Sequence, residues 1–306
     1  MGKIAFVFSG QGAQYSGMGK SLFSLSPAAK HVFETADSLR PGTSKQCFEG
    51  TAEELSVTVN TQPCLYSVDL AAARALEEAG IHPDFVSGFS LGEVAALTFA
   101  GAFTDEDGFN FVCKRAAAMQ EAAEKNPGAM AAVLKLDNAA VENLCAEFDA
   151  VWPVNYNCPG QLTVAGEKAQ LEAFCKRVAE SGGRAVPLAV SGGFHSPLMA
   201  SAADVLESTL SEIHMKAPQV PVYANLNAQP YEGDLKSTLV CQVKNPVRWQ
   251  ETVEALAAQG VDTFFECGAG KTLCGLIKKT VRDAKVFRVE DAETLAAAIE
   301  YVQGNN

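Results

Sequence analysis

The sequence lacks any long hydrophobic run, although 48% of its 306 residues are hydrophobic. A membrane-spanning helix needs about 18 consecutive apolar residues, and the clean apolar stretches here have the length of strands. The first of them, Ile4 to Phe8, is also shorter than the roughly 7–15 apolar residues of a signal peptide. The pattern therefore predicts a cytoplasmic protein without membrane contact.

Basic residues are in the minority, with 24 Lys and Arg against 36 Asp and Glu and a formal net charge of −12. Such a chain has no general affinity for the nucleic-acid backbone, which is itself negative. The nine cysteines include no CxxC pair, and the histidines lack metal-ligand spacing. We therefore expect reduced cysteines, no nucleic-acid partner and no bound metal.

The order of strand-like and helical segments predicts an α/β protein of about two domains. Residues 130–190 have the order strand, helix, strand, strand, helix, strand, which is typical of a ferredoxin-like unit. We therefore expect a large domain from residues 1–127 and 191–306, interrupted by a small domain at 128–190. Within the large domain, Pro63 is expected to open a helix that ends at Ala79.

A GxSxG segment is the first candidate for chemistry. Gly88-Phe89-Ser90-Leu91-Gly92 follows a short apolar strand and precedes a helical stretch. A nucleophile elbow has this order, and its glycines avoid collisions between side chains on either side of the serine. The amide of Leu91 would then face a tetrahedral oxyanion. A serine that only caps the helix is the alternative.

A serine hydroxyl needs a base, and histidine is the usual one because its unperturbed pKa is about 6.5. His195 lies in Ser191-Gly192-Gly193-Phe194-His195-Ser196-Pro197, a turn at the expected joint between the domains. Clefts form at such joints, so His195 is the best candidate for the base. A structural or surface histidine is the alternative.

The loop Gly10-Gln11-Gly12-Ala13-Gln14, after the first strand, is also rich in glycine. It lacks the last glycine of a dinucleotide-binding fingerprint, and Gly19-Lys20-Ser21 lacks the first glycine of a phosphate-binding loop. A nucleotide-binding module is therefore kept only as an alternative. The backbone amide of Gln11 can instead supply a second oxyanion donor.

Arg115 lies at the margin of the apolar stripe of the helical stretch 107–125. Most such arginines extend their charged ends into water. An arginine turned into a cleft would instead hold a carboxylate by two parallel hydrogen bonds and would select acyl groups with a free acid end. The residue alone leaves both interpretations open.

Several segments together resemble one enzyme family. They are FVFSGQGAQ, GFSLGE, KRAAAMQEA, NYNCPGQLTVAG, SGGFHSP, QVKNPVRW and ECGAGKTL, spread over essentially the whole chain. Their order resembles that of the malonyl-CoA:acyl carrier protein transacylases of fatty-acid synthesis. The resemblance implies an α/β-hydrolase-like large domain with an inserted ferredoxin-like (βαββαβ) small domain.

The resemblance also implies roles for individual residues. Ser90 would be the nucleophile and His195 the base, with the amides of Gln11 and Leu91 as the oxyanion hole and Arg115 as the clamp for the malonyl carboxylate. No acidic partner for the histidine is evident in the sequence. We therefore expect a backbone group near residue 242 to orient the imidazole.

Further positions match the family less closely. Gln242 matches the position that orients the histidine, Asn157 matches a residue near the pocket, and Phe194 matches a residue associated with a preference for malonyl over methylmalonyl groups. The family usually has histidine where this chain has Phe89, and glycine where it has Ala116. We expect activity to survive, with drier surroundings for the serine.

The implied reaction has two halves. Malonyl-CoA would esterify Ser90 with loss of coenzyme A, and the phosphopantetheine thiol of acyl carrier protein would then take the malonyl group. No metal or other cofactor is expected beyond the substrate, and the enzyme is expected to be a monomer. A serine ester or thioester hydrolase, and a malonyltransferase that serves a polyketide carrier protein, are the alternatives.

A basic stretch is the candidate surface for the acidic carrier protein. It contains Lys278, Lys279, Arg282 and Lys285, with Asp283 as its one acid. Opposite charges would steer the two proteins together. A solvated helix face without a partner is the alternative.

Overall fold

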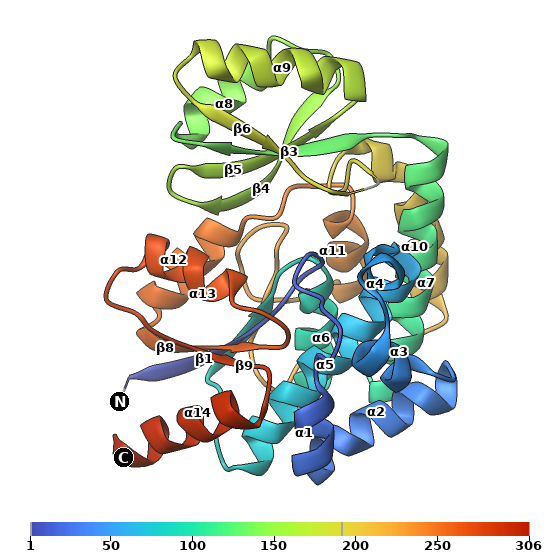
Figure 1. Ribbon diagram of the computed structural model, residues 1–306, viewed down its shortest axis with the longest axis vertical. Coiled ribbons are helices and arrows are strands. Elements are labelled where there is room, and N and C mark those ends of the chain that lie inside the picture. Colours follow the sequence, from blue (N-terminus) through green and yellow to red (C-terminus); the bar gives the residue numbers. More distant parts are fainter. Residues whose placement is uncertain (1, 191, 306) are drawn as a thin grey trace.

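The computed structural model describes residues 2–190 and 192–305, and its strands form two separate sheets (Figure 1). The larger sheet is five-stranded and parallel, in the order β7-β2-β1-β8-β9. Its strands are β1 (Lys3–Phe8), β2 (Phe85–Gly88), β7 (Val222–Tyr223), β8 (Val261–Cys267) and β9 (Lys285–Val289).

The central strand β1 is buried on both faces because helices cover both sides of the sheet. Phe6 and Phe8 face one hydrophobic core, and Ala5 and Val7 face another. Parallel strands in α/β proteins are apolar throughout for this reason. The carboxyl ends of β1 and β2 therefore meet at one edge, where the loops that follow them lie together.

The rest of the larger unit consists of helices and the loops that connect them. They are α1 (Lys20–Leu25), α2 (Pro27–Leu39), α3 (Thr43–Glu49), α4 (Ala52–Ser56), α5 (Thr58–Glu78), α6 (Leu91–Phe99), α7 (Asp105–Lys125), the 3-10 helix Pro197–Met199, α10 (Ala200–Ser211), α11 (Leu235–Gln242), α12 (Trp249–Ala258), α13 (Thr272–Thr280) and α14 (Ala292–Gly304). None of the helices in the described ranges has the length and apolar character that crossing a membrane requires.

The smaller unit is a four-stranded antiparallel sheet in the order β4-β5-β3-β6. Helices α8 and α9 cover the face turned away from the larger unit (Figure 1). Its elements are β3 (Ala129–Leu134), α8 (Asn138–Cys145), β4 (Val151–Cys158), β5 (Gln161–Gly166), α9 (Lys168–Glu180) and β6 (Arg184–Pro187).

The predicted fold class is confirmed: an α/β-hydrolase-like large unit carries an inserted βαββαβ ferredoxin-like unit. The boundaries at 128–190 remain a prediction, and Ser191, with which the second segment of the large domain was expected to start, lies outside the described residues.

Some expected elements were wrong in their ends. Helix α5 starts at Thr58, so Pro63 lies inside it instead of opening it. The cap residue Val57 has no side-chain hydrogen bond that would mark the start, and the helix is buried on nearly every side, so packing outweighs the backbone bond that proline removes. The basic stretch near Lys278 comprises the end of α13, a turn and the start of β9.

Candidate active site

Ser90 occupies the sharp turn between β2 and α6. Its backbone angles, φ 55° and ψ −100°, are unusual for a residue other than glycine. A Cβ added at Gly88 would overlap the backbone of Gly92, and one added at Gly92 would overlap the backbone of Phe8. Both glycines of the GxSxG segment are therefore required by close backbone approach, and the turn presents the serine at the start of the helix.

His195 lies against this serine. Its Nε2 is 2.7 Å from Ser90 Oγ, and its Nδ1 is 2.9 Å from the carbonyl oxygen of Gln242. Since a carbonyl only accepts, Nδ1 must carry the proton, which leaves Nε2 free to accept from the serine hydroxyl. The imidazole partner is thus a backbone carbonyl from the end of α11.

The surroundings of His195 favour its neutral form. Burial, together with the positive charge of Arg115, lowers the pKa of the imidazole to about 4. The hydrogen bond to the Gln242 carbonyl acts in the opposite direction. At neutral pH the histidine is therefore unprotonated at Nε2 and can act as a general base.

Arg115 extends from α7 into the same place and is fully buried. Its Nη1 donates to Gln62 Oε1 at 2.8 Å, and its Nη2 donates to Ser90 Oγ at 3.1 Å and to Gln242 Oε1 at 2.9 Å. Burial lowers the pKa of the guanidinium to about 10, so it remains charged at neutral pH. The arginine is turned inward and does not extend into water.

A cavity of about 90 Å³ opens beside these groups. Ser90, His195, Gln11 and Phe194 line it together with apolar side chains such as Met119. Neither the Gln11 amide nor the Leu91 amide has a protein acceptor within the described ranges, so both are free to donate to a ligand atom. The cavity can therefore hold a small acyl group next to the serine.

Asn157 lies outside this cavity. Its Nδ2 donates to Thr163 Oγ1 at 3.0 Å, and the residue lines a neighbouring cavity of about 170 Å³. Gln11 and Phe89 line both cavities. The ring of Phe89 packs edge-on against Trp249 with 5.6 Å between centroids, so an aromatic side chain lies next to Ser90 in the elbow.

The sequence analysis missed three buried polar residues behind the serine. The side-chain oxygen of Asn225 accepts the Ser90 amide at 2.7 Å. The carboxylate of Glu93 accepts a hydrogen bond from the backbone N–H of Asn225 at 2.8 Å and another from the Tyr231 hydroxyl. Glu93 was present in the GFSLGE segment, and its polar character inside an otherwise apolar helix was the available signal. Asn225 and Tyr231 gave no comparable signal.

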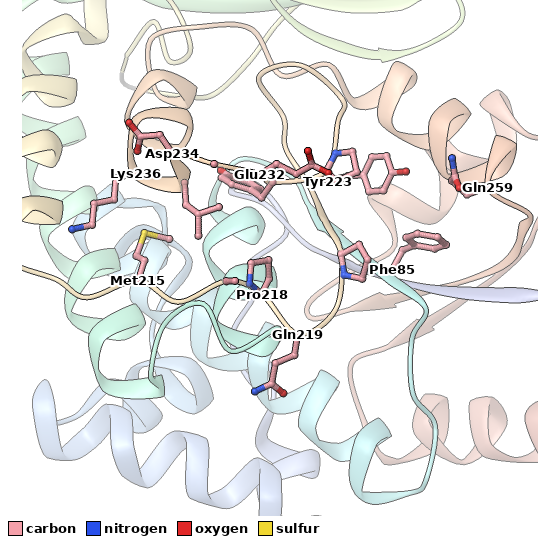
Figure 2. A pocket seen from close by; sticks show the side chains of 15 residues that line it. Phe85, Met215, Pro218, Gln219, Tyr223, Glu232, Asp234, Lys236 and Gln259 are labelled. Carbon is pink, nitrogen blue, oxygen red and sulfur yellow. The ribbon is translucent and has the colours of Figure 1, made fainter.

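A much larger cavity lies elsewhere, beside the edge strand β7. It has a volume of about 820 Å³, and Figure 2 shows the rings of Phe85 and Tyr223 on one side of it. Lys236, Asp234 and Glu232 belong to its polar lining. It contains neither the serine nor the histidine, so its size alone does not make it the reaction site.

The predicted docking residues are exposed. Lys278 and Lys279 lie in the last turn of helix α13, and Arg282 lies in the turn that follows the helix. Lys279 Nζ donates to Gln161 Oε1 of the small unit at 3.3 Å. Because Gln161 lines the cavity of about 170 Å³, the basic stretch lies near the opening between the two units.

The fold and the serine-histidine pair define an acyltransferase of the α/β class, and the family model described as acyl transferase domain matches residues 5–301. The chain belongs to the malonyl CoA-acyl carrier protein transacylase family. It is 43% identical to the malonyl CoA-acyl carrier protein transacylase of Bacillus subtilis, over 100% of this chain and 99% of that protein.

Solved structures of the family agree. The crystal structure of the transacylase from Clostridium perfringens has a TM-score of 0.95 and 35% identity, covering 99% of this chain and 98% of that one. A malonyl-transacylase solved in complex with a type II PKS acyl-carrier protein has a TM-score of 0.94 and 37% identity, covering 98% of this chain and 99% of that one.

Proposed function

We propose that this enzyme transfers the malonyl group of malonyl-CoA to the thiol of acyl carrier protein through an ester on Ser90. One observation carries the proposal: Ser90 Oγ lies 2.7 Å from His195 Nε2 and 3.1 Å from Arg115 Nη2. A nucleophile, a neutral base and a buried cation thus meet at one oxygen. The names of the relatives at 43% and 39% identity support the same substrate and acceptor.

In the first half reaction, Ser90 attacks the thioester carbonyl while His195 Nε2 takes the hydroxyl proton. The amides of Gln11 and Leu91 stabilise the oxyanion that forms. The carbon–sulfur bond then breaks, and the histidine returns the proton to the departing coenzyme A thiolate. The product is a malonyl-serine ester.

In the second half reaction, the phosphopantetheine thiol of the carrier protein attacks the ester. His195 takes the thiol proton and then gives it to Ser90 Oγ as the ester bond breaks. The same base serves both halves, and the first product leaves before the second substrate reacts, which gives ping-pong kinetics. These steps are proposed to need no metal or other cofactor, because the residues named here carry every proton transfer.

Arg115 supplies the selectivity for an acyl group with a free acid end. Its guanidinium is fully buried, so a carboxylate that reaches it gains a charge-assisted hydrogen bond away from water. Its Nε has no hydrogen-bond partner among the described residues, and Nη2 can exchange its bond to Ser90 Oγ for one to a carboxylate oxygen, which would also free the nucleophile. Acetyl groups lack this interaction.

The carrier protein is proposed to dock on the basic stretch that includes Lys278, Lys279 and Arg282. These residues are exposed beside the opening between the units, where a phosphopantetheine arm would enter. The neighbour solved with a type II PKS acyl-carrier protein favours a polyketide carrier as a second candidate acceptor.

We further propose that the enzyme is a monomer located in the cytoplasm. Phe194 is proposed to contribute to the preference for malonyl groups.

Mass spectrometry after brief exposure to malonyl-CoA tests the proposal. One malonyl adduct is expected on the Ser90 peptide, and a fatty-acid carrier protein should discharge it faster than a polyketide carrier protein. The reverse order would move the assignment to polyketide synthesis. Rapid loss of the adduct without any thiol would indicate a hydrolase, and an adduct that forms equally on Ser90→Ala would contradict the role of the serine.

A further inference from the structure

The charge of Arg115 has no direct carboxylate partner within residues 2–190 and 192–305. Its bonded neighbours are the neutral side chains of Gln62, Gln242 and Ser90. A buried cation is costly unless it is paired or well hydrogen-bonded. Direct pairing, however, would occupy the donors that a substrate carboxylate needs.

The carboxylate of Glu93 lies one side chain further away. Gln242 Nε2 donates to Glu93 Oε2 at 3.3 Å, while Gln242 Oε1 accepts from Arg115 Nη2 at 2.9 Å. The same Nε2 donates to the carbonyl oxygen of Ser90 at 2.7 Å. Glu93 is fully buried and is held in place by the Asn225 amide and the Tyr231 hydroxyl.

An amide side chain has one donating end and one accepting end, so its orientation depends on its neighbours. Two acceptors, the Ser90 carbonyl and the Glu93 carboxylate, face the NH₂ end of Gln242. The carbonyl end therefore faces Arg115. If the Gln242 amide were reversed, its NH₂ group would face the Arg115 guanidinium. Its oxygen would then face the Ser90 carbonyl oxygen and the Glu93 carboxylate.

We infer that Glu93 is a positioning residue which, through the side chain of Gln242, keeps Arg115 oriented and available for an acyl carboxylate. This inference rests on the proposed function. The negative charge of Glu93 stabilises the buried cation across one neutral amide, while the donors of Arg115 stay exchangeable. Glu93 thereby contributes to the selectivity for malonyl over acetyl groups without touching either.

Protonation of Glu93 should weaken this arrangement. Burial raises the pKa of the Glu93 carboxyl to about 7, although its hydrogen bonds and Arg115 lower it. The titratable and charged groups that face it are Tyr231, from the loop after β7, and Arg115, from α7. Since a protonated carboxyl loses its charge and part of its accepting capacity, the preference for malonyl groups should decline as the pH falls through this value.

The test compares esterification of Ser90 by malonyl-CoA and by acetyl-CoA in single-turnover experiments between pH 6 and 8. In Glu93→Gln the negative charge is lost; the amide oxygen takes the position that faces the two donors Asn225 N and Gln242 Nε2, and the NH₂ group faces the Tyr231 hydroxyl. We therefore expect the malonyl-to-acetyl rate ratio to fall at least about tenfold and to lose its pH dependence. Equal losses for both substrates would show a merely structural role and would overturn the inference.

Tyr231→Phe keeps the inference testable if Glu93→Gln does not fold. Loss of one donor to the carboxylate should lower the malonyl-to-acetyl ratio by about two- to fivefold. It should also raise the pKa of Glu93, so that the ratio begins to decline at a higher pH than in the wild type. Tyr66→Phe is the control, because Tyr66 is also a buried tyrosine and its hydroxyl donates to Thr98 Oγ1 instead of to Glu93. An unchanged ratio in Tyr231→Phe, or an equal change in Tyr66→Phe, would contradict the inference.

The wild-type enzyme separates the two proposals. If it forms no ester from malonyl-CoA, the proposed function fails. If it forms the ester and the Glu93 and Tyr231 variants keep the wild-type malonyl-to-acetyl ratio, only the role of Glu93 fails.

Discussion

Two hollows of this molecule differ in what surrounds them. The cavity beside β7 has about 820 Å³, and the cavity at Ser90 has about 90 Å³. Only the small one contains a nucleophile bonded to a buried histidine whose pKa burial lowers to about 4. Reaction chemistry thus follows convergent, desolvated polar groups and not volume.

The largest expected effect belongs to the small cavity. Ser90→Ala removes the atom that carries the acyl group, so malonyl transfer should fall by on the order of 10⁴-fold or more. A carrier-protein acylation assay measures this loss, and circular dichroism checks that the fold persists. Near-normal transfer would mean that the reaction takes place at another residue.

Arg115→Ala should reduce esterification by malonyl-CoA on the order of 10²-fold because a charge-assisted pair with the carboxylate is lost. Acetyl-CoA should lose far less, so the preference between the two substrates narrows. Arg115→Lys is the control that keeps the charge but not the paired donors. Equal losses for both acyl groups would argue against a carboxylate clamp.

The buried histidine also predicts a pH effect on stability. Its pKa in the folded state lies below its ordinary value of 6.5, so the unfolded chain binds the proton more readily. The contribution of the neutral histidine to the free energy of unfolding is complete above pH 6.5 and is lost as the pH falls toward 4. Wild type should therefore lose on the order of 3 kcal/mol relative to His195→Gln over this interval.

Denaturant unfolding of both proteins at several pH values measures this difference. Parallel stability curves for wild type and His195→Gln would contradict a lowered histidine pKa in the folded state.

A smaller effect is expected at the docking stretch. Lys278→Glu combined with Lys279→Glu should raise KM for the carrier protein severalfold at low salt, with malonyl-CoA kinetics unchanged. Lys168→Glu combined with Lys176→Glu, at two exposed lysines of α9, is the charge-matched control. If carrier-protein kinetics do not change, or do not depend on salt, the docking surface lies elsewhere.

The smallest effect is expected at the large cavity. Gln259 lines it with an exposed side chain, so Gln259→Ala should leave both half reactions within about twofold of wild type. A large loss of malonyl transfer would break the contrast between the two cavities. It would show that the larger one takes part in the reaction.

Local sequence signals were strong for Ser90 and weak for the residues that surround it. The GxSxG segment predicts a sharp turn because a turn of this kind needs glycines two residues before and two residues after the serine, and these positions can be read directly from the sequence. Asn225 and Tyr231 lie far along the chain in irregular segments, and no periodicity marks them. The sequence did not predict the start of α5 correctly. Val57 has no side chain that could cap the helix, and a proline such as Pro63 is typical of the first turn of a helix.

By itself the sequence determined the alternation of strands and helices, the inserted unit and the tight turn at residue 90, because these depend on neighbours a few positions apart. Only the tertiary structure decided that Arg115, Gln242 and Glu93 meet behind that turn, and that Asn157 lies in the adjoining cavity. Hydrogen-bond geometry and desolvation depend on distances across the folded chain, and separation along the sequence does not encode them.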